Sequence, residues 1–219
     1  MLFRSNLDIL LTGRGTRGGL TKLYRNQTLH TNSPPAPPVD LAAVVSGRRV
    51  LLSWSPGPDG NQTNGLSYNL RVGTSPGSEN VLPAMADLLT GRRRLPQPGN
   101  ASLSFHWVLN ELPVGIYYWS VQAIDHSFTG SIFGAEQTFV IAPAANEPPL
   151  LQSALLLPTG EFDLTLIGNP GTEYSIDIST DLILWTQWRV VQPSNAVITF
   201  SDSDIVLQSA RFYRARQRP

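Results

Sequence analysis

The chain consists of short runs of alternating apolar and polar residues separated by turn-forming residues. The clearest runs in its middle part cover residues 49–54, 66–72, 102–107, 116–123 and 136–141. A period of two places alternate side chains on one face of a β-strand, and short strands at this spacing indicate an antiparallel sandwich. Glycine and proline, with 18 residues each, favour turns over long helices. The sequence therefore predicts an all-β fold, in which only residues 84–90 could form a helical turn.

Two proline-rich stretches, residues 33–38 and 142–149, divide the chain. Such stretches favour extended backbone and act as semi-rigid spacers. We therefore expect a short N-terminal part (residues 1–33), a middle domain (34–142) and a small C-terminal antiparallel β-domain (148–219). The two domains are predicted to fold independently and the chain to be monomeric.

Charge and cysteine content exclude several classes of protein. Lysine plus arginine and aspartate plus glutamate number 16 each, so the chain lacks the basic surface that a nucleic-acid binder needs. The run Arg92-Arg93-Arg94 is interpreted as a solvated loop or an edge-strand guard. The absence of cysteine excludes disulfides and thiolate metal sites.

Membrane and export signals are not evident either. No apolar stretch has the length of a membrane-spanning helix. Asp8 interrupts the first apolar stretch, so no signal peptide is visible.

The middle part carries a resemblance to a known family. Three segments, in this order, resemble a fibronectin type III domain. They are Val50-Leu51-Leu52-Ser53-Trp54-Ser55-Pro56, residues 68–72, and Leu112-Pro113-Val114-Gly115 followed by residues 116–123. The resemblance implies an immunoglobulin-like sandwich with Trp54 in its core. It also implies a tyrosine corner, in which a tyrosine hydroxyl bonds back to the backbone. Tyr117 is the best match, and Tyr118 is the alternative because the spacing to Gly115 is one residue shorter than usual.

The N-terminal part, Asn6 to Gly13 followed by Leu23-Tyr24, is similar to the end of an FG-GAP or VCBS repeat. That family implies a blade of a β-propeller, whose loop of alternating aspartates binds calcium. Asp8 matches the last of these aspartates, but Arg4 stands where another ligand is required, so Asp8 is a vestigial loop residue and no metal site is expected. The glycine-rich residues 13–19 are interpreted as a loop of this remnant.

The C-terminal part alternates in residues 161–166 and 172–178. The intervening Gly168-Asn169-Pro170-Gly171 predicts a hairpin between these two strands. This part resembles a small β-domain at the C-termini of secreted bacterial proteins, a type without an assigned activity. The residues that carry the resemblance are Ser179, Asp181, Leu182 and Trp185, with the ending Arg211-Phe212-Tyr213-Arg214. The resemblance implies a secreted or cell-surface location.

Catalytic patterns are absent from the sequence. His30, His106 and His126 are isolated, and we interpret His106 as an edge-strand residue and His126 as a turn residue. The carboxylates Asp177, Asp181, Asp202 and Asp204 are interpreted as turn formers. No nucleophile elbow or phosphate-binding loop is present. We therefore expect neither an enzyme nor a cofactor.

Aromatic residues are the candidate ligand contacts. Trp107, Tyr118, Trp185 and Trp188 could stack on sugars or contact a protein, although core packing is the more common role of such residues in a small sandwich. Three glycosylation sequons, at Asn26, Asn61 and Asn100, indicate exposed loops.

Two functions follow from these observations. The first is a non-catalytic spacer or adhesion module of a bacterial surface or secreted protein. The alternative is an accessory carbohydrate-binding module of a polysaccharide-degrading enzyme. Coplanar exposed rings on one sheet would favour the alternative, and buried rings would favour the spacer.

Overall fold

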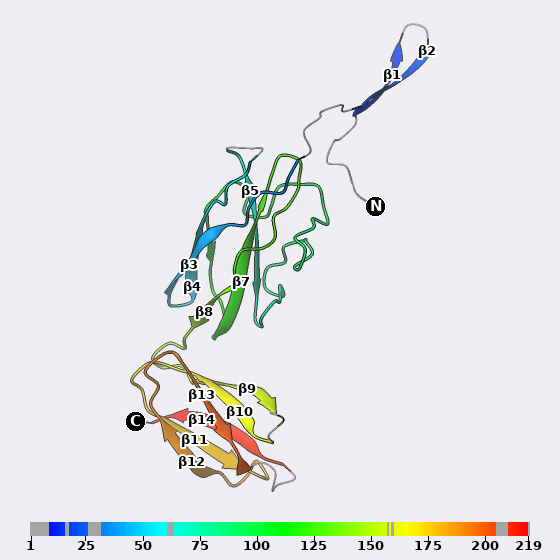
Figure 1. The fold of residues 1–219 in the computed structure, drawn as a ribbon. Coiled ribbons are helices and arrows are strands. Elements are labelled where there is room, and N and C mark those ends of the chain that lie inside the picture. Colours follow the sequence, from blue (N-terminus) through cyan, green and yellow to red (C-terminus); the bar gives the residue numbers. More distant parts are fainter. Residues whose placement is uncertain are drawn as a thin grey trace.

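The computed structural model describes residues 9–15, 18–25, 32–60, 64–156, 158, 160–204 and 210–218, and within these ranges it contains strands but no α-helix. The predicted all-β class is confirmed. Figure 1 shows an N-terminal hairpin and two β-units that follow one another along the chain. The hairpin comprises β1 (Ile9–Gly15) and β2 (Gly18–Tyr24). The first β-unit comprises β3 (Val39–Ser46), β4 (Arg49–Ser55), β5 (Ser67–Gly73), β6 (His106–Leu109), β7 (Gly115–Ile124) and β8 (Gln137–Ile141). The second β-unit comprises β9 (Leu150–Leu156), β10 (Phe162–Ile167), β11 (Tyr174–Ser179), β12 (Thr186–Val191), β13 (Val197–Asp202) and β14 (Phe212–Gln217).

The first β-unit is a sandwich of two three-stranded antiparallel sheets, β3-β4-β6 and β5-β7-β8. Alternate apolar side chains of the strands point between the sheets, as the period of two requires. Trp54 on β4 and Trp119 on β7 lie in this core, with 4% and 0% of their surface exposed. The other buried members are Val50, Leu52, Leu66, Tyr68, Leu70, Val72, Ala101, Leu112, Tyr117, Val121, Ala123, Phe139 and Ile141.

Tyr117 forms the corner at the start of β7. Its hydroxyl donates a hydrogen bond to the Pro113 carbonyl oxygen at 2.9 Å, and its ring stacks on Phe139 with centroids 5.1 Å apart. Burial raises the pKa of Tyr117. The predicted core positions of Trp54 and Tyr117 are confirmed, and the corner tyrosine is Tyr117 rather than Tyr118.

The first proline-rich stretch packs against the first β-unit and does not stand free, contrary to the prediction. Pro35 and Pro38 are buried, and the Ala36 amide donates to the Pro58 carbonyl at 2.9 Å. This close approach requires Gly57, because a Cβ there would lie 2.4 Å from the Ala36 carbonyl oxygen. The stretch is therefore part of the sandwich that follows it.

The second proline-rich stretch is also held by the first β-unit. Arg48, in the turn between β3 and β4, donates to the Glu147 carboxylate at 2.6 Å and to the Leu112 carbonyl at 3.1 Å. The Ala144 amide donates to the same carboxylate at 2.9 Å. The Arg48 hydrogen bond, followed by that from Ala144, lowers the pKa of Glu147. Pro143 is buried, so this linker has a defined path.

The long connection between β5 and β6, residues 74–105, covers the outer face of sheet β5-β7-β8. The Asn69 amide donates to the Ala84 carbonyl at 2.5 Å and to Gln122 Oε1 at 3.0 Å. The Gln122 amide in turn donates to the carbonyls of Gly91 and Ser131. Residues 84–90 thus form turns that are tied to the sheet by buried amides. The Gly91 amide donates to the Asp87 carbonyl at 2.8 Å, so a single helical turn forms at the end of this segment, as the sequence allowed.

Two other predictions for this connection need correction. The predicted strand over residues 102–107 begins only at His106, because Ser102 adopts a positive φ of 54° and residues 99–104 form turns. Arg92 and Arg94 are exposed, but Arg93 is half-buried and donates to the Ala84 carbonyl at 3.0 Å. Burial lowers the pKa of Arg93. Arg93 therefore holds the connection in place and is not a solvated charge.

The same connection closes the outer edge of β5. The backbone of Tyr68 exchanges hydrogen bonds with residues 101 and 102, and that of Val72 with residues 81 and 82. Between them, the Asn100 side chain accepts from the Leu70 amide and donates to the Leu70 carbonyl, both at 2.7 Å. The Asn100 amide thus takes the place of a backbone peptide at a sheet edge.

The second β-unit has a separate core between sheets β13-β10-β9 and β12-β11-β14. Its buried members are Leu164, Leu166, Tyr174, Ile176 and Phe200.

The predicted hairpin between β10 and β11 is wrong, because these strands pair with different neighbours in opposite sheets. The Tyr174 ring lies close to Gly168, where an added Cβ would be 2.7 Å from it, and the Tyr174 hydroxyl accepts a hydrogen bond from the Asn169 amide at 2.7 Å. The connection is therefore folded over the core from one sheet to the other.

The N-terminal hairpin pairs Ile9 with Tyr24 and Gly15 with Gly18. Residues 13–15, 18 and 19 belong to its strands, so most of the stretch that was predicted to be a loop is paired backbone. Apolar side chains on both faces are more than half exposed: Ile9, Leu10, Leu11, Leu20, Leu23 and Tyr24. Asp8, His30 and Asn26 lie outside the described residues.

Candidate functional site

Trp107 and Tyr118 lie on different sheets of the first β-unit. Trp107 on β6 is half-buried and packs against the sandwich core. Tyr118 on β7 is half-buried on the face opposite Tyr117. The structure therefore does not bring these two rings together.

Trp188 on β12 is packed into the second core. Its ring centroid lies 5.9 Å from that of Phe200 and 6.0 Å from that of Tyr213. The Arg189 guanidinium lies over the indole at 4.2 Å from the ring centroid. Trp188 is thus surrounded by aromatic and cationic groups of its own domain.

Trp185 lies on the other side of the same sheet, at the end of the loop between β11 and β12. Its indole N–H donates to the Leu182 carbonyl at 3.1 Å, and the Arg214 guanidinium lies 4.4 Å from the ring centroid. The loop that precedes it exposes Leu182, Ile183 and Leu184, which we call the apolar tip; their exposed fractions are 57%, 80% and 75%. Sequence reasoning missed this tip, because an apolar run is typical of a buried segment.

An ion-pair network lies on the outer face of sheet β12-β11-β14. The Asp177 carboxylate on β11 accepts from Arg214 Nε at 2.9 Å and Arg216 Nε at 2.7 Å, and from the Ser175 hydroxyl at 2.8 Å. Burial raises the pKa of Asp177, but the hydrogen bonds from Arg216, Ser175 and Arg214 outweigh it and lower the pKa to about 2. The interpretation of Asp177 as a turn former is therefore wrong, because its carboxylate lies within a strand and joins three strand residues.

Asp202 also does more than form a turn. Its carboxylate accepts from the Tyr213 hydroxyl at 2.7 Å and from the Asp204 amide at 2.9 Å, and Arg211 Nε lies 2.8 Å from it. Burial, followed by the hydrogen bond to Asp202, raises the pKa of Tyr213. By contrast, Asp181 is a turn former as predicted: it accepts from the amides of residues 183 and 184, and these bonds lower its pKa.

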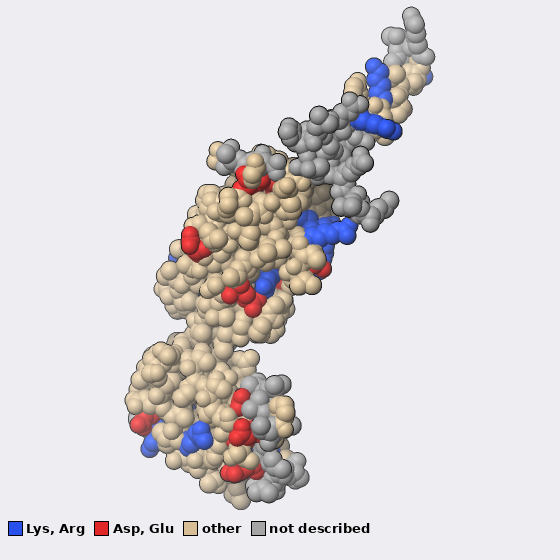
Figure 2. All heavy atoms as spheres, in the orientation of Figure 1, with Lys and Arg blue, Asp and Glu red and all other residues tan. Residues whose placement is uncertain are grey.

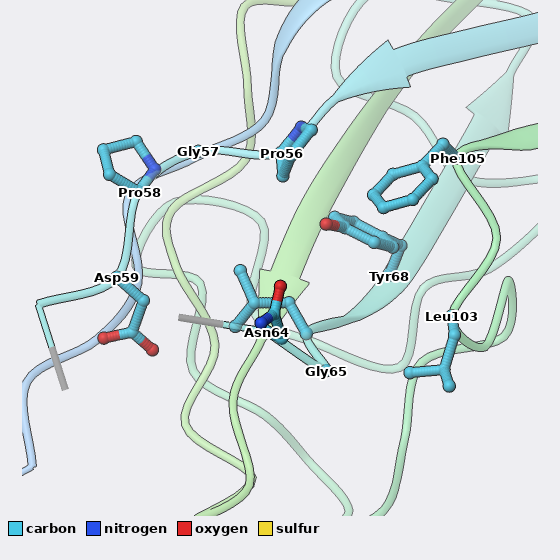
Figure 3. A pocket seen from close by; sticks show the side chains of 10 residues that line it. Pro56, Gly57, Pro58, Asp59, Asn64, Gly65, Tyr68, Leu103 and Phe105 are labelled. Carbon is cyan, nitrogen blue, oxygen red and sulfur yellow. The ribbon is translucent and has the colours of Figure 1, made fainter. Parts of the chain in front are cut away.

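A pocket of about 590 Å³ lies at the end of the first β-unit. Figure 3 shows the segment from Pro56 to Asp59 on one side and Leu103 and Phe105 on the other, with the Tyr68 ring between them. Leu103 and Phe105 are 62% and 49% exposed, and the rings of Tyr68 and Phe105 are 5.4 Å apart. The residues that line this apolar pocket are Pro56, Gly57, Pro58, Asp59, Asn64, Gly65, Leu66, Tyr68, Leu103 and Phe105.

The remaining candidates are dispersed. His106 is on the edge strand β6 and His126 is in a turn, as predicted. Asn61 lies outside the described residues, and the amide of Asn100 is engaged with Leu70. Within the described residues, no three carboxylate, histidine or cysteine side chains gather as a metal site would require. In the view of Figure 2, both β-units have a mainly uncharged surface with charged side chains in small separate groups.

The strand order of the first β-unit, together with the corner at Tyr117, decides its fold. Strands one, two and four of the unit form one sheet and strands three, five and six form the other, which is the immunoglobulin-like arrangement without an added edge strand. The first β-unit is a fibronectin type III-like sandwich.

The described part of the chain contains no helix long and apolar enough to cross a membrane.

Comparison of the whole chain with known proteins gives only distant likenesses to solved structures. No family model and no curated protein matches the chain. Among solved structures, the central fibronectin-III array of RIM-binding protein aligns over 86% of this chain and 65% of that chain, with 15% identity and a TM-score of 0.31. The α-L-rhamnosidase from Dictyoglumus thermophilum aligns over 68% of this chain and 18% of that chain, with 16% identity and a TM-score of 0.35.

Proposed function

We propose that the chain is a non-catalytic module of a bacterial secreted or cell-surface protein, in which small β-units act as a spacer or present an adhesion surface. The observation that carries this proposal is the held linker between the two β-units. Glu147 is bound by Arg48 and by the Ala144 amide, and Pro143 is buried. A linker fixed in this way maintains a distance between domains, which a flexible tether does not.

The positions of the four candidate rings favour this function over a carbohydrate-binding module. Sugar stacking uses flat rings that share one exposed surface. Trp107 and Tyr118 lie on different sheets, and Trp188 packs into the second core. Only Trp185 is near a solvent-facing loop, and Arg214 lies over its ring.

The proposal includes an origin for the hairpin, as the remnant of an FG-GAP or VCBS blade. Its two faces both carry exposed apolar side chains, such as Ile9 and Leu11 on one and Leu10 and Leu23 on the other. Propeller blades are packed on both faces by neighbouring blades. A strand pair from such a blade would have this composition.

Distance measurements within one chain test the spacer function. The chain has no cysteine, so cysteines at the exposed positions Ser75 and Ser194 can carry a donor and an acceptor dye. We expect one narrow transfer-efficiency distribution, and a broader one in Arg48→Ala, which releases Glu147. A broad distribution in the parent would overturn the spacer.

Incubation with polysaccharides tests the other parts of the proposal. If an activity that releases reducing sugar co-purifies with the chain, a non-catalytic function is contradicted. Retention by neutral polysaccharide in affinity electrophoresis, lost in Trp185→Ala, would favour the carbohydrate-binding alternative.

A further inference from the structure

The apolar tip is the feature of the second β-unit that its own fold does not explain. Leu182, Ile183 and Leu184 are consecutive, and each exposes more than half of its surface. A run of exposed apolar residues is unfavourable in water unless another surface covers it. The tip therefore has the composition of a contact surface.

Hydrogen bonds hold the tip in one conformation. The Ser179 hydroxyl accepts from the amides of residues 181 and 182, and Asp181 accepts from those of residues 183 and 184. The Trp185 indole closes the loop by donating to the Leu182 carbonyl. Because the loop is already ordered, binding through it would lose little conformational entropy.

The apolar pocket of the first β-unit is the concave counterpart of this tip. Its volume of about 590 Å³ exceeds the roughly 150 Å³ cavity that holds a benzene molecule, so it has room for more than one aliphatic side chain. Leu103 and Phe105 leave apolar surface exposed at its rim. The pocket is also lined by the Asp59 carboxylate, whereas Arg214 lies over the Trp185 ring beside the tip. The tip and the pocket are thus both apolar, and the charged groups beside them are of opposite sign, with Arg214 also bound to Asp177 within its own unit.

Strand registers place the tip and the pocket at opposite ends of the two-unit body. Ser67 at the start of β5 pairs with Ile124, whereas Ile141, which leads into the linker, pairs with Gly115 at the other end of β7. The pocket, at the start of β5, is therefore remote from the linker. In the second β-unit, Leu150 enters from the linker beside Ile167, and β11 runs from that end toward the tip.

We propose that the apolar tip of one chain binds the apolar pocket of a second copy of the same chain. Because the two surfaces lie at opposite ends, the contact is heterologous and joins copies head to tail in an open row. The contact is small, so the association has low affinity and depends on protein concentration. This proposal extends beyond the spacer function and does not depend on it, since the dye distances are measured within one chain.

Sedimentation equilibrium of the full chain over a concentration series tests the proposal. We expect the weight-average mass to rise with concentration, and Ile183→Asp to weaken association about tenfold or more, because a buried aliphatic side chain is replaced by a charge. Leu89→Asp is the matched control, since Leu89 is 88% exposed in a different loop. A mass that stays monomeric at all concentrations, or an equal effect of the control, would overturn the proposal.

A mixing experiment tests the head-to-tail geometry. Ile183→Asp removes the tip and Leu103→Asp blocks the pocket, so each variant alone should be monomeric. An equimolar mixture should form a one-to-one dimer that grows no further. Absence of that dimer would refute the geometry, and tip-dependent binding of a monomeric parent to phosphatidylcholine–phosphatidylglycerol vesicles would assign the tip to a lipid surface instead.

Discussion

At the residue scale, some buried polar groups of the two β-units have partners on strands that are distant in the sequence. Asp177 illustrates this, because Arg214 and Arg216 reach it from β14. Sequence spacing gave no sign of this pairing, since the partners are more than thirty residues away. By contrast, the core role of Trp54 was predictable, because alternation fixes the face of a strand on which a residue lies.

The ion pairs of Asp177 predict acid sensitivity of the second β-unit. The folded-state pKa of about 2 is below the ordinary value of 3.8, so the stabilisation is complete above the ordinary pKa and is lost as the pH falls through the folded-state value. Asp177→Asn should lower the free energy of unfolding by about 1 to 3 kcal/mol at neutral pH. In this variant the melting temperature should fall less as the pH is lowered through that acid range. Thermal melts of residues 148–219 measure both effects, and Asp204→Asn, at an exposed position, is the control. An unchanged pH profile in Asp177→Asn would contradict the assignment.

Trp54 and Tyr117 predict two different losses in the first β-unit. Trp54→Ala should cost about 3 to 5 kcal/mol, because it empties part of the core. Tyr117→Phe should cost about 1 to 3 kcal/mol, because it leaves the Pro113 carbonyl without its hydroxyl partner. Chemical denaturation of residues 34–142 compares them with Tyr118→Phe, which should have little effect. A reversal of the order between the two tyrosine variants would contradict the corner assignment.

At the scale of elements, strands with regular alternation were predictable and their partners were not. The runs that contain β4, β5, β7 and β8 were recognised within a residue or two. Pairing of β10 with β11 failed as a prediction because the Tyr174 ring over Gly168 turns the chain toward the other sheet. The connection over residues 74–105 has no period, and its path is determined by contacts with distant residues, among them the buried amides of Asn69 and Gln122.

Gly57 predicts how tightly the first proline-rich stretch is docked. Gly57→Ala places a methyl group 2.4 Å from the carbonyl oxygens of Ala36 and Pro37, so the stretch must shift away. We expect a loss of about 1 to 3 kcal/mol, with faster hydrogen exchange at the Ala36 amide. Gly60→Ala is the control, because its Cβ would meet no atom within 4 Å. Equal stability of the two variants would show that the stretch is not docked there.

At the scale of the whole molecule, the two β-units have separate cores and are joined by one held linker. The predicted boundaries at residues 34–142 and 148–219 remain to be tested. Expressed separately, each should unfold in a single cooperative transition, because the buried clusters share no residue among those described. Calorimetry of the two pieces and of the full chain measures this. A piece that melts cooperatively only in the presence of the other would show that the boundary is misplaced.

The closed edge of β5 has a consequence for a protein that places several sandwiches close together. A strand from an unfolding neighbour can extend a sheet only where backbone groups are free to receive it. At Tyr68, Leu70 and Val72 these groups are already occupied, at Leu70 by the Asn100 amide. Along this edge the folded sandwich therefore cannot seed fibril growth, however high the local concentration of neighbouring copies becomes.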